Sequence, residues 1–181
     1  REEVDGCLSR YGKTPTELMN SLGLFEYGGG GFHCVHFTRS DRDIFREKGL
    51  WAVTNPASNL KLSSGIAELH KMREAGVRMA IGTDGPASNN CLDMFREMFL
   101  VTGLQKVITE DPSVMPADFV LRMAAQNGAL AMGLDDCDCL AVGKRADLIV
   151  IDLNRPNMQP LNDIGKNIVY SGSKDNIYLT M

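Results

Sequence analysis

The sequence lacks the features that mark membrane and nucleic-acid-binding proteins. Among its 181 residues, no apolar run approaches the roughly 18 that a helix needs to cross a bilayer. The formal net charge of −4 provides no basic excess to attract a nucleic acid or an anionic membrane surface. The opening residues, Arg1 to Val4, have no signal-peptide character. We therefore expect a soluble, cytoplasmic protein that binds neither membrane nor nucleic acid.

Disulfide, zinc-cluster and phosphate-loop patterns are also missing. The five cysteines are an odd-numbered set spread over the chain, which indicates free thiols in a reducing compartment. Cys137-Asp138-Cys139 has no second Cys or His pair at zinc spacing, so we interpret it as a loop. The run Gly28 to Gly31 is not followed by Gly-Lys-Ser/Thr, and it is interpreted as a break between elements.

Apolar periodicity predicts helices that alternate with short strands. With 44% hydrophobic residues, the chain has ample material for a core. Ser40 is expected to cap the third helix, with Asp43 in its first turn. Because helices separate the first three strands, these strands should pair in parallel through right-handed crossovers. The expected helices cover 2–10, 14–22, 40–48, 66–76, 92–104 and 116–131, and the expected strands 32–37, 50–54, 77–81, 146–152, 168–170 and 177–180.

The strongest functional signal is Asp84, which follows the buried strand predicted for Val77 to Ile81. In parallel sheets and barrels, ligands, metals and catalytic groups gather at the carboxyl ends of the strands. Asp84 is therefore the first candidate for a functional residue. The alternative is that its carboxylate only caps the helix that follows.

Only three histidines are present, and each has a functional and a structural interpretation. His33 is a candidate for catalysis, and the alternative is a buried histidine with a hydrogen-bonded partner in the core. His36 lies three residues further along the same predicted strand and should face the opposite side, which favours a structural role. His70 is expected on a helix surface or in packing.

Four motifs in order resemble the amidohydrolase superfamily. They are His33-Cys34-Val35-His36, the run Asn55 to Leu62, Gly82-Thr83-Asp84-Gly85 with Ser88-Asn89-Asn90, and the run Val142 to Leu148. Within the superfamily, the chain is most similar to the 5-methylthioadenosine/S-adenosylhomocysteine deaminases, with related aminohydrolases and triazine chlorohydrolases close behind. The resemblance implies a (β/α)8 barrel with a β-sandwich built from both chain ends.

On this resemblance, residues 1–136 correspond to about strands 6–8 of the barrel with their helices, and residues 137–181 to the start of the β-sandwich. The absence of an initiator Met agrees with the expectation that the chain is the second half of a longer protein.

The resemblance also implies roles for single residues. Asp84 corresponds to the aspartate that binds the divalent metal and accepts a proton from the attacking water. His33 corresponds to the histidine that holds the substrate group under attack and stabilises charge in the tetrahedral adduct. The pocket residues that bind substrate correspond to Asn55, Ser58, Asn59 and Ser88, together with His33.

Several parts of the family pattern are absent. The chain contains no His-x-His, and it lacks the His and Glu that end the fifth strand in the family. Three of the four usual metal ligands and the acid for the purine ring nitrogen would therefore lie outside this chain, which alone should neither bind metal tightly nor catalyse. Thr54 stands where many relatives have histidine, which leaves the substrate subgroup less well defined, and Cys137-Asp138-Cys139 replaces the usual Gly-Ser-x-Glu before the sandwich.

Two classes of function follow. In the first, the parent protein is a metal-dependent hydrolase, with zinc as the expected metal, that removes ammonia from an adenosine-type purine nucleoside; a triazine chlorohydrolase or guanine-type deaminase is the near variant. In the second, it is a non-catalytic scaffold or a folding fragment without activity. Because an unclosed barrel leaves strand edges unpaired, we also expect the isolated chain to self-associate.

Overall fold

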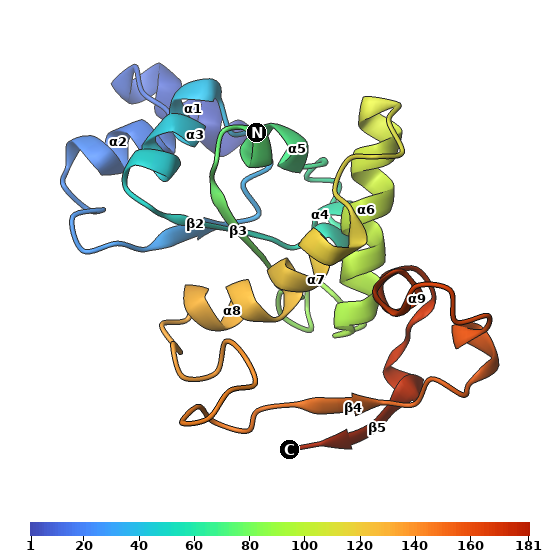
Figure 1. The fold of residues 1–181 in the computed structure, drawn as a ribbon. Helices are drawn as coiled ribbons and strands as arrows, with labels where there is room; N and C mark the ends of the chain where they lie inside the picture. The colour runs from blue at the N-terminus through green and yellow to red at the C-terminus, as the bar shows by residue number, and fades with distance from the viewer.

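A three-stranded parallel sheet organises the first half of the chain. The computed structural model describes all residues from Arg1 to Met181. Strands β1 (Gly30–Phe32), β2 (Trp51–Thr54) and β3 (Arg78–Ile81) lie in the order β1-β2-β3, and both pairings are parallel (Figure 1). In this register Ala52 pairs with Gly31 on one side and Met79 on the other. The predicted parallel pairing is confirmed, and the carboxyl ends of the three strands lie at one edge of the sheet.

Helices lie before, between and after the strands. Thr14 caps the second helix through a reciprocal pair with Glu17, as expected for Thr-Pro at a helix start. The helices are α1 (Glu2–Tyr11), α2 (Pro15–Ser21), α3 (Arg39–Glu47), α4 (Pro56–Lys61), α5 (Leu69–Glu74), α6 (Met94–Thr109), α7 (Ala117–Ala124), α8 (Gln126–Ala131) and α9 (Ile164–Ser171), with two short 3-10 turns, η1 (Pro156–Met158) and η2 (Lys174–Asn176).

The first strand differs from the prediction of 32–37. β1 ends at Phe32 because His33 (φ 66°) and Cys34 (φ 51°) adopt left-handed backbone conformations that no strand continues. The glycines, expected only to break structure, supply the strand itself. A Cβ at Gly30 would lie 2.2 Å from the carbonyl oxygen of Trp51, so the close approach of β1 to β2 requires glycine there.

The capping of α3 also differs from the prediction. Thr38, not Ser40, is the N-cap residue, and Asp41, not Asp43, completes the capping box. The Thr38 hydroxyl accepts the Asp41 N–H at 3.2 Å, and Asp41 accepts the Thr38 N–H at 2.7 Å. Asp41 is buried and also accepts a hydrogen bond from the Thr14 hydroxyl. This contact with the residue that caps α2 favours a helix start at Thr38 over one at Ser40.

Three further segments depart from the predicted pattern. The expected loop at 55–59 contains the start of α4, which begins at Pro56. The expected helix 116–131 is divided into α7 and α8 by the non-helical backbone of Ala125. The expected strand 168–170 lies within α9, because Asp163 caps that helix by accepting the Lys166 N–H.

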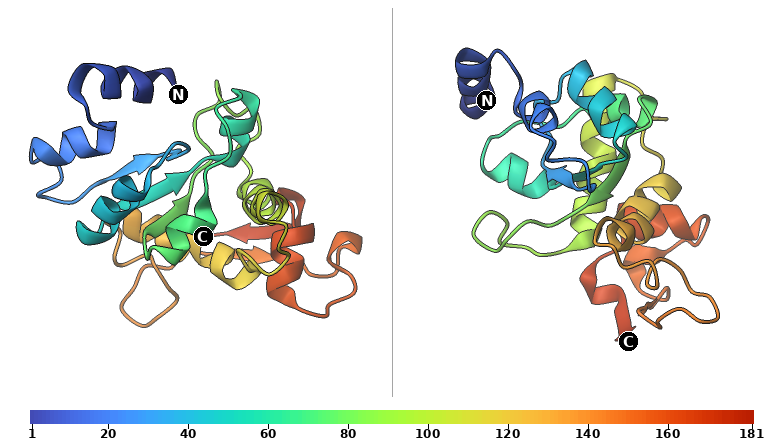
Figure 2. Two further views of the ribbon diagram at one scale, coloured as in Figure 1. Left: turned by 90° about the horizontal axis from the view of Figure 1, so that it is seen from above. Right: turned by 90° about the vertical axis from the view of Figure 1, so that its left-hand side faces the viewer.

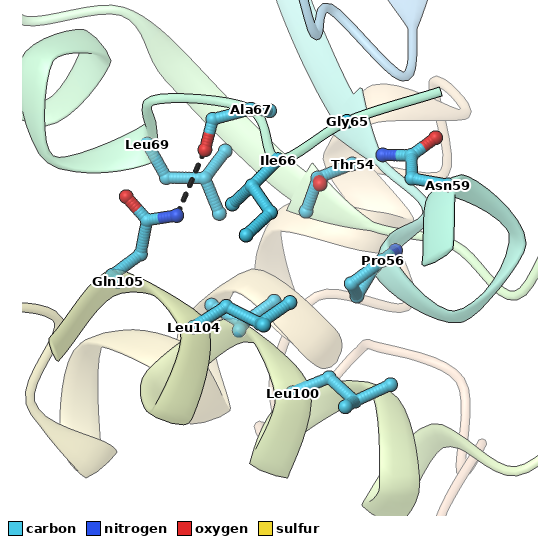
Figure 3. A pocket seen from close by; sticks show the side chains of 11 residues that line it. Thr54, Pro56, Asn59, Gly65, Ile66, Ala67, Leu69, Leu100, Leu104 and Gln105 are labelled. Atoms are coloured by element: carbon cyan, nitrogen blue, oxygen red, sulfur yellow. Dashed lines mark hydrogen bonds between the residues drawn. The ribbon is translucent and has the colours of Figure 1, made fainter. Parts of the chain in front are cut away.

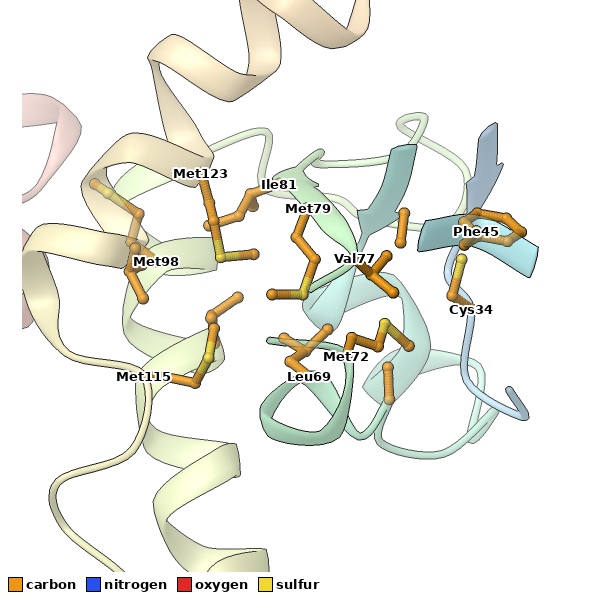
Figure 4. Close-up of a cluster of buried hydrophobic side chains, with 14 of the residues drawn as sticks. Cys34, Phe45, Leu69, Met72, Val77, Met79, Ile81, Met98, Met115 and Met123 are labelled. Carbon is orange, nitrogen blue, oxygen red and sulfur yellow. The ribbon is translucent and has the colours of Figure 1, made fainter. Parts of the chain in front are cut away.

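The hydrophobic core joins the sheet to the helices that cover it. Its main cluster contains 19 buried residues, including Ala52 of β2, Val101 of α6, Val120 of α7 and Val169 of α9. In Figure 4 the β3 side chains Met79 and Ile81 lie among methionines from neighbouring segments, namely Met98, Met115 and Met123. This packing fixes the strands, and therefore fixes the positions at which the loops leave them.

The end of the chain forms a separate antiparallel pair. β4 (Ile149–Ile151) and β5 (Ile177–Thr180) lie apart from the parallel sheet in both Figure 1 and Figure 2. α9, between them in sequence, packs against α6 and α7. All four residues of β5 are exposed, Tyr178 by 80%. No helix of the structure combines the length and the apolar character that a membrane span requires.

Candidate active site

The site lies where the parallel strands end. His33 follows β1, Asn55 follows β2, and Asp84 stands three residues after the end of β3. The structure brings the two principal candidates together, because Nε2 of His33 lies 3.9 Å from Oδ2 of Asp84. His33, Cys34 and Asp84 (φ 62°) all have left-handed backbones, a conformation that is uncommon outside glycine and that costs energy.

The Asp84 carboxylate is held in its ionised form. Its Oδ2 accepts a hydrogen bond from the Ser58 hydroxyl at 2.6 Å, and its Oδ1 accepts the Gly85 N–H at 2.7 Å. The Ser58 hydroxyl lowers the pKa of Asp84 most, followed by the Gly85 N–H, with a further contribution from His33. The helix-cap alternative for Asp84 is wrong, since Asp93 caps the following helix, α6.

The His33 ring is oriented by one amide. Its Nδ1 lies 2.8 Å from Oδ1 of Asn59. Because an amide oxygen only accepts, Nδ1 carries the proton in this pair, and Nε2 is the nitrogen on the Asp84 side. The His33 side chain is 41% exposed, so the alternative of a buried core histidine is wrong. Two neighbouring residues of α4 therefore orient the two candidates: Asn59 orients His33, and Ser58 orients Asp84.

A cavity of about 590 Å³ opens beside these residues. Its lining includes His33, Asp84 and Ser88, together with Phe37 and other side chains from the first 41 residues. The predicted pocket residues Asn55, Ser58 and Asn59 are buried and do not line this cavity. Oδ1 of Asn55 has no hydrogen-bond partner, and a Cβ at Gly82 would lie only 2.8 Å from Nδ2 of Asn55, so these two residues pack in contact.

The remaining histidines and the nearby thiol have different environments. His36 lines the same cavity, so its predicted orientation away from His33 is wrong, because residue 36 lies outside any strand. Burial lowers the pKa of His36. His70 packs against α6, where its Nδ1 lies 3.0 Å from Oε1 of Gln105. Burial raises the pKa of the Cys34 thiol to about 12, which makes it a poor nucleophile at neutral pH. All five cysteines are free, as predicted.

A second, much smaller cavity lies between the Thr54–Leu69 segment and α6 (Figure 3). Its volume is about 10 Å³, which is close to the space of a single water molecule. Thr54 lines it with Leu100 and Leu104, and Thr54 does not line the larger cavity. Thr54 therefore lies behind the site and not on the wall of the larger cavity.

The sequence did not identify Glu97 as a site residue. Its side chain is fully buried in the first turn of α6. One carboxylate oxygen accepts the Ala57 N–H at 3.0 Å, and the other accepts Nδ2 of Asn89 at 2.7 Å. No sequence signal marked it, because Glu97 lies away from the apolar side formed by Phe95, Met98 and Phe99, and charged residues are usually exposed.

Comparison with known proteins gives one consistent result. The model of the amidohydrolase family matches residues 2–181. The 5-methylthioadenosine/S-adenosylhomocysteine deaminase of Moorella thermoacetica is 46% identical over 172 residues, which is 94% of this chain and 40% of the relative. The chain thus spans about two fifths of the length of the curated relatives it matches.

Solved structures agree with the sequence comparison. An adenosine deaminase from Xanthomonas campestris with bound zinc has a TM-score of 0.90 and 34% identity, covering 97% of this chain and 40% of that protein. An atrazine chlorohydrolase from Arthrobacter aurescens TC1 complexed with zinc has a TM-score of 0.88 at 23% identity, covering 99% of this chain and 40% of that protein, and this likeness shows the fold alone.

Proposed function

This chain belongs to the amidohydrolase family, and we propose that the protein containing it is a metal-dependent deaminase that removes ammonia from an adenosine-type purine nucleoside. The observation that carries the proposal is the pairing of Asp84 with His33 at the carboxyl end of the sheet, with Ser58 and Asn59 orienting them. The relatives named 5-methylthioadenosine/S-adenosylhomocysteine deaminase supply the substrate class.

We further propose that residues 1–136 form about strands 6–8 of a (β/α)8 barrel and that residues 137–181 begin a β-sandwich. The parallel order β1-β2-β3 supports the barrel assignment, and the antiparallel β4–β5 pair supports the sandwich assignment. In this arrangement Asp84 follows the eighth strand and His33 the sixth. Both stand at the end of the barrel where catalytic residues gather.

The residues present fit one part of a metal site. The partly exposed Asp84 carboxylate uses one lone pair on each oxygen and retains another, so it is suited to hold zinc as one of several ligands. This chain has no group of three or more ligating side chains, so Asp84 needs partners from other parts of the protein. The metal would supply Lewis-acid chemistry and lower the pKa of its water to about 7. The zinc bound in the similar adenosine deaminase from Xanthomonas campestris supports this choice.

The side chains of this chain have complementary roles in the proposed reaction. Asp84, ionised before the reaction, accepts the proton that the attacking water loses. Nδ1 of His33 already donates to Asn59, so a hydrogen bond to the substrate comes from Nε2 and requires the imidazolium form. In that form His33 holds the group under attack and stabilises negative charge in the adduct. Ser88 binds substrate from the cavity wall. The buried Ser58 and Asn59 act behind the wall by orienting Asp84 and His33, and Asn55 supports them from the start of α4.

A deaminase assay on the full-length protein tests this function. We expect 5-methylthioadenosine and S-adenosylhomocysteine to show the ultraviolet change from an adenine to a hypoxanthine base, and we expect a chelator to abolish it. No turnover of either nucleoside with zinc demonstrably bound would reject this substrate class in favour of guanine or triazine substrates. A full-length protein that binds no metal would instead support the hypothesis of a non-catalytic scaffold.

We propose that the isolated chain self-associates. β1 and β3 each have one unpaired edge, and the β4–β5 pair exposes Val150 by 42% and Leu179 by 43%. Sedimentation velocity of residues 1–181 over a range of concentrations should show species larger than the monomer, increasing with concentration. A strictly monomeric profile at the highest concentration would contradict the proposal, and the full-length protein serves as the comparison.

We also propose a cytoplasmic location. The five free cysteines, of which Cys139 is exposed, suit a reducing compartment.

A further inference from the structure

The buried carboxylate of Glu97 connects the two segments that carry the site, the helix α4 and the loop around Asn89. It lies on α6, 40 residues from Ala57 in sequence and eight residues from Asn89. Both carboxylate oxygens accept hydrogen bonds, one from Ala57 and one from Asn89. The ionised form suits these two donors, because a protonated carboxyl would carry an O–H group with no acceptor among them. Burial raises the pKa of Glu97, while the bonds from Ala57 and Asn89 oppose this rise. An ionisable group buried in this way is costly to retain for packing alone.

The first branch of the network leads into α4. The Ala57 N–H belongs to the first turn of that helix, where N–H groups have no partner within the helix, and the N-cap residue Asn55 provides no side-chain cap. Glu97 supplies the missing acceptor. The next two residues are Ser58, which donates to Asp84, and Asn59, which accepts from His33. The position of α4 therefore sets the position of both partners.

The second branch leads to the residue before Asp84. Asn89 is buried, and its Nδ2 donates both to Glu97 and to the carbonyl oxygen of Thr83 at 2.8 Å. Its Oδ1 accepts the Cys91 N–H at 3.1 Å, so the whole amide is engaged. Through this amide, Glu97 also fixes the turn in which Asp84 adopts its left-handed backbone.

We propose that Glu97 is a positioning residue for the reaction: it touches neither substrate nor metal, but it holds α4 and the loop around Asn89 so that His33 and Asp84 face each other. The catalytic part of this proposal rests on the function proposed above. Residues that orient a metal ligand or a catalytic base from behind typically contribute 10- to 100-fold to activity or metal affinity.

Glu97→Gln in the full-length protein is the first test. The amide places an NH2 group against one of the two donors, so one branch of the network is lost. We expect kcat for 5-methylthioadenosine to fall by about 10- to 100-fold, with KM nearly unchanged. Gln105→Ala is the matched control, because Gln105 is also buried on α6 and bonds across to Ala67 and His70, away from the site. This control should lower Tm and retain kcat.

A readout independent of activity separates this proposal from the proposed function. Ring-nitrogen NMR of His33, assigned with the His33→Asn variant, should show a protonated Nδ1 in the wild type that changes in Glu97→Gln and is unchanged in Gln105→Ala. If the wild type has no deaminase activity but the His33 signal still changes in Glu97→Gln, the proposed function is rejected and the positioning role of Glu97 is retained. A wild-type signal and wild-type kcat in Glu97→Gln would overturn the proposal. If Glu97→Gln does not fold, Glu97→Asp, which keeps the charge but shortens the reach, replaces it in the same comparison.

Discussion

Asp84→Asn in the full-length protein is expected to lower kcat for 5-methylthioadenosine by about 10³-fold or more, toward the upper end of the contribution of a general base. Asparagine has nearly the same shape as aspartate, and the Ser58 hydroxyl is able to accept from the new NH2 group where it now donates. The amide, however, accepts no proton at neutral pH and is a weaker metal ligand. The assay measures kcat and KM together with zinc content by elemental analysis.

Asp93→Asn is the control for this experiment. Asp93 lies in the same loop region, and its carboxylate caps α6 by accepting the Phe95 N–H at 3.0 Å. Asparagine is an equally good cap, so stability and activity should both be retained. If Asp84→Asn keeps kcat within about tenfold of the wild type, the loss is below the range for a general base and the assigned role is wrong.

His33→Ala is expected to lower kcat by about 10²- to 10³-fold, which is the usual cost of removing one donor that stabilises charge in a transition state. The change in kcat should exceed the change in KM, because the hydrogen bond from Nε2 strengthens as negative charge develops. The substitution also leaves Oδ1 of Asn59 without its partner. Steady-state kinetics with 5-methylthioadenosine gives both constants.

Two further variants make the His33 result specific. His33→Asn accommodates the left-handed backbone at this position better than alanine does, so it separates the loss of the imidazole from backbone strain. His70→Ala removes a histidine that packs against Gln105 outside the site, and it should leave kcat unchanged. Equal losses in His33→Ala and His70→Ala would indicate general destabilisation and would contradict the assigned role.

Some parts of the fold were predictable because a single local signal determined them. The segment 77–81 is apolar and buried at every position except Arg78, a pattern that a covered strand satisfies, and β3 lies within it. The segment 168–170 was misassigned because Ile-Val-Tyr has the composition of a strand, whereas the helix signal, Asp163, lies five residues upstream. The signal for α4 was also present, since Pro56 suits the first position of a helix.

The contacts of the site were less predictable than its members. Asp84 could be placed at the end of a strand, whereas His33 was predicted inside the strand 32–37 and in fact follows β1. The residues that orient both side chains depend on α4, because its helical form places Ser58 near Asp84 and Asn59 near His33. Glu97 was missed because exposed charges on helices are common, and only the packed structure shows that this one is fully buried.

The left-handed backbones of His33, Cys34 and Asp84 have a consequence for how such a chain evolves. Glycine adopts this conformation without the steric penalty that other residues carry. At Cys34, burial in the core opposes glycine. At positions 33 and 84, relief of backbone strain favours glycine, and a use for the imidazole and the carboxylate opposes that change. Mutational libraries of the full-length protein, sorted once for folding and once for turnover, should diverge most at positions 33 and 84.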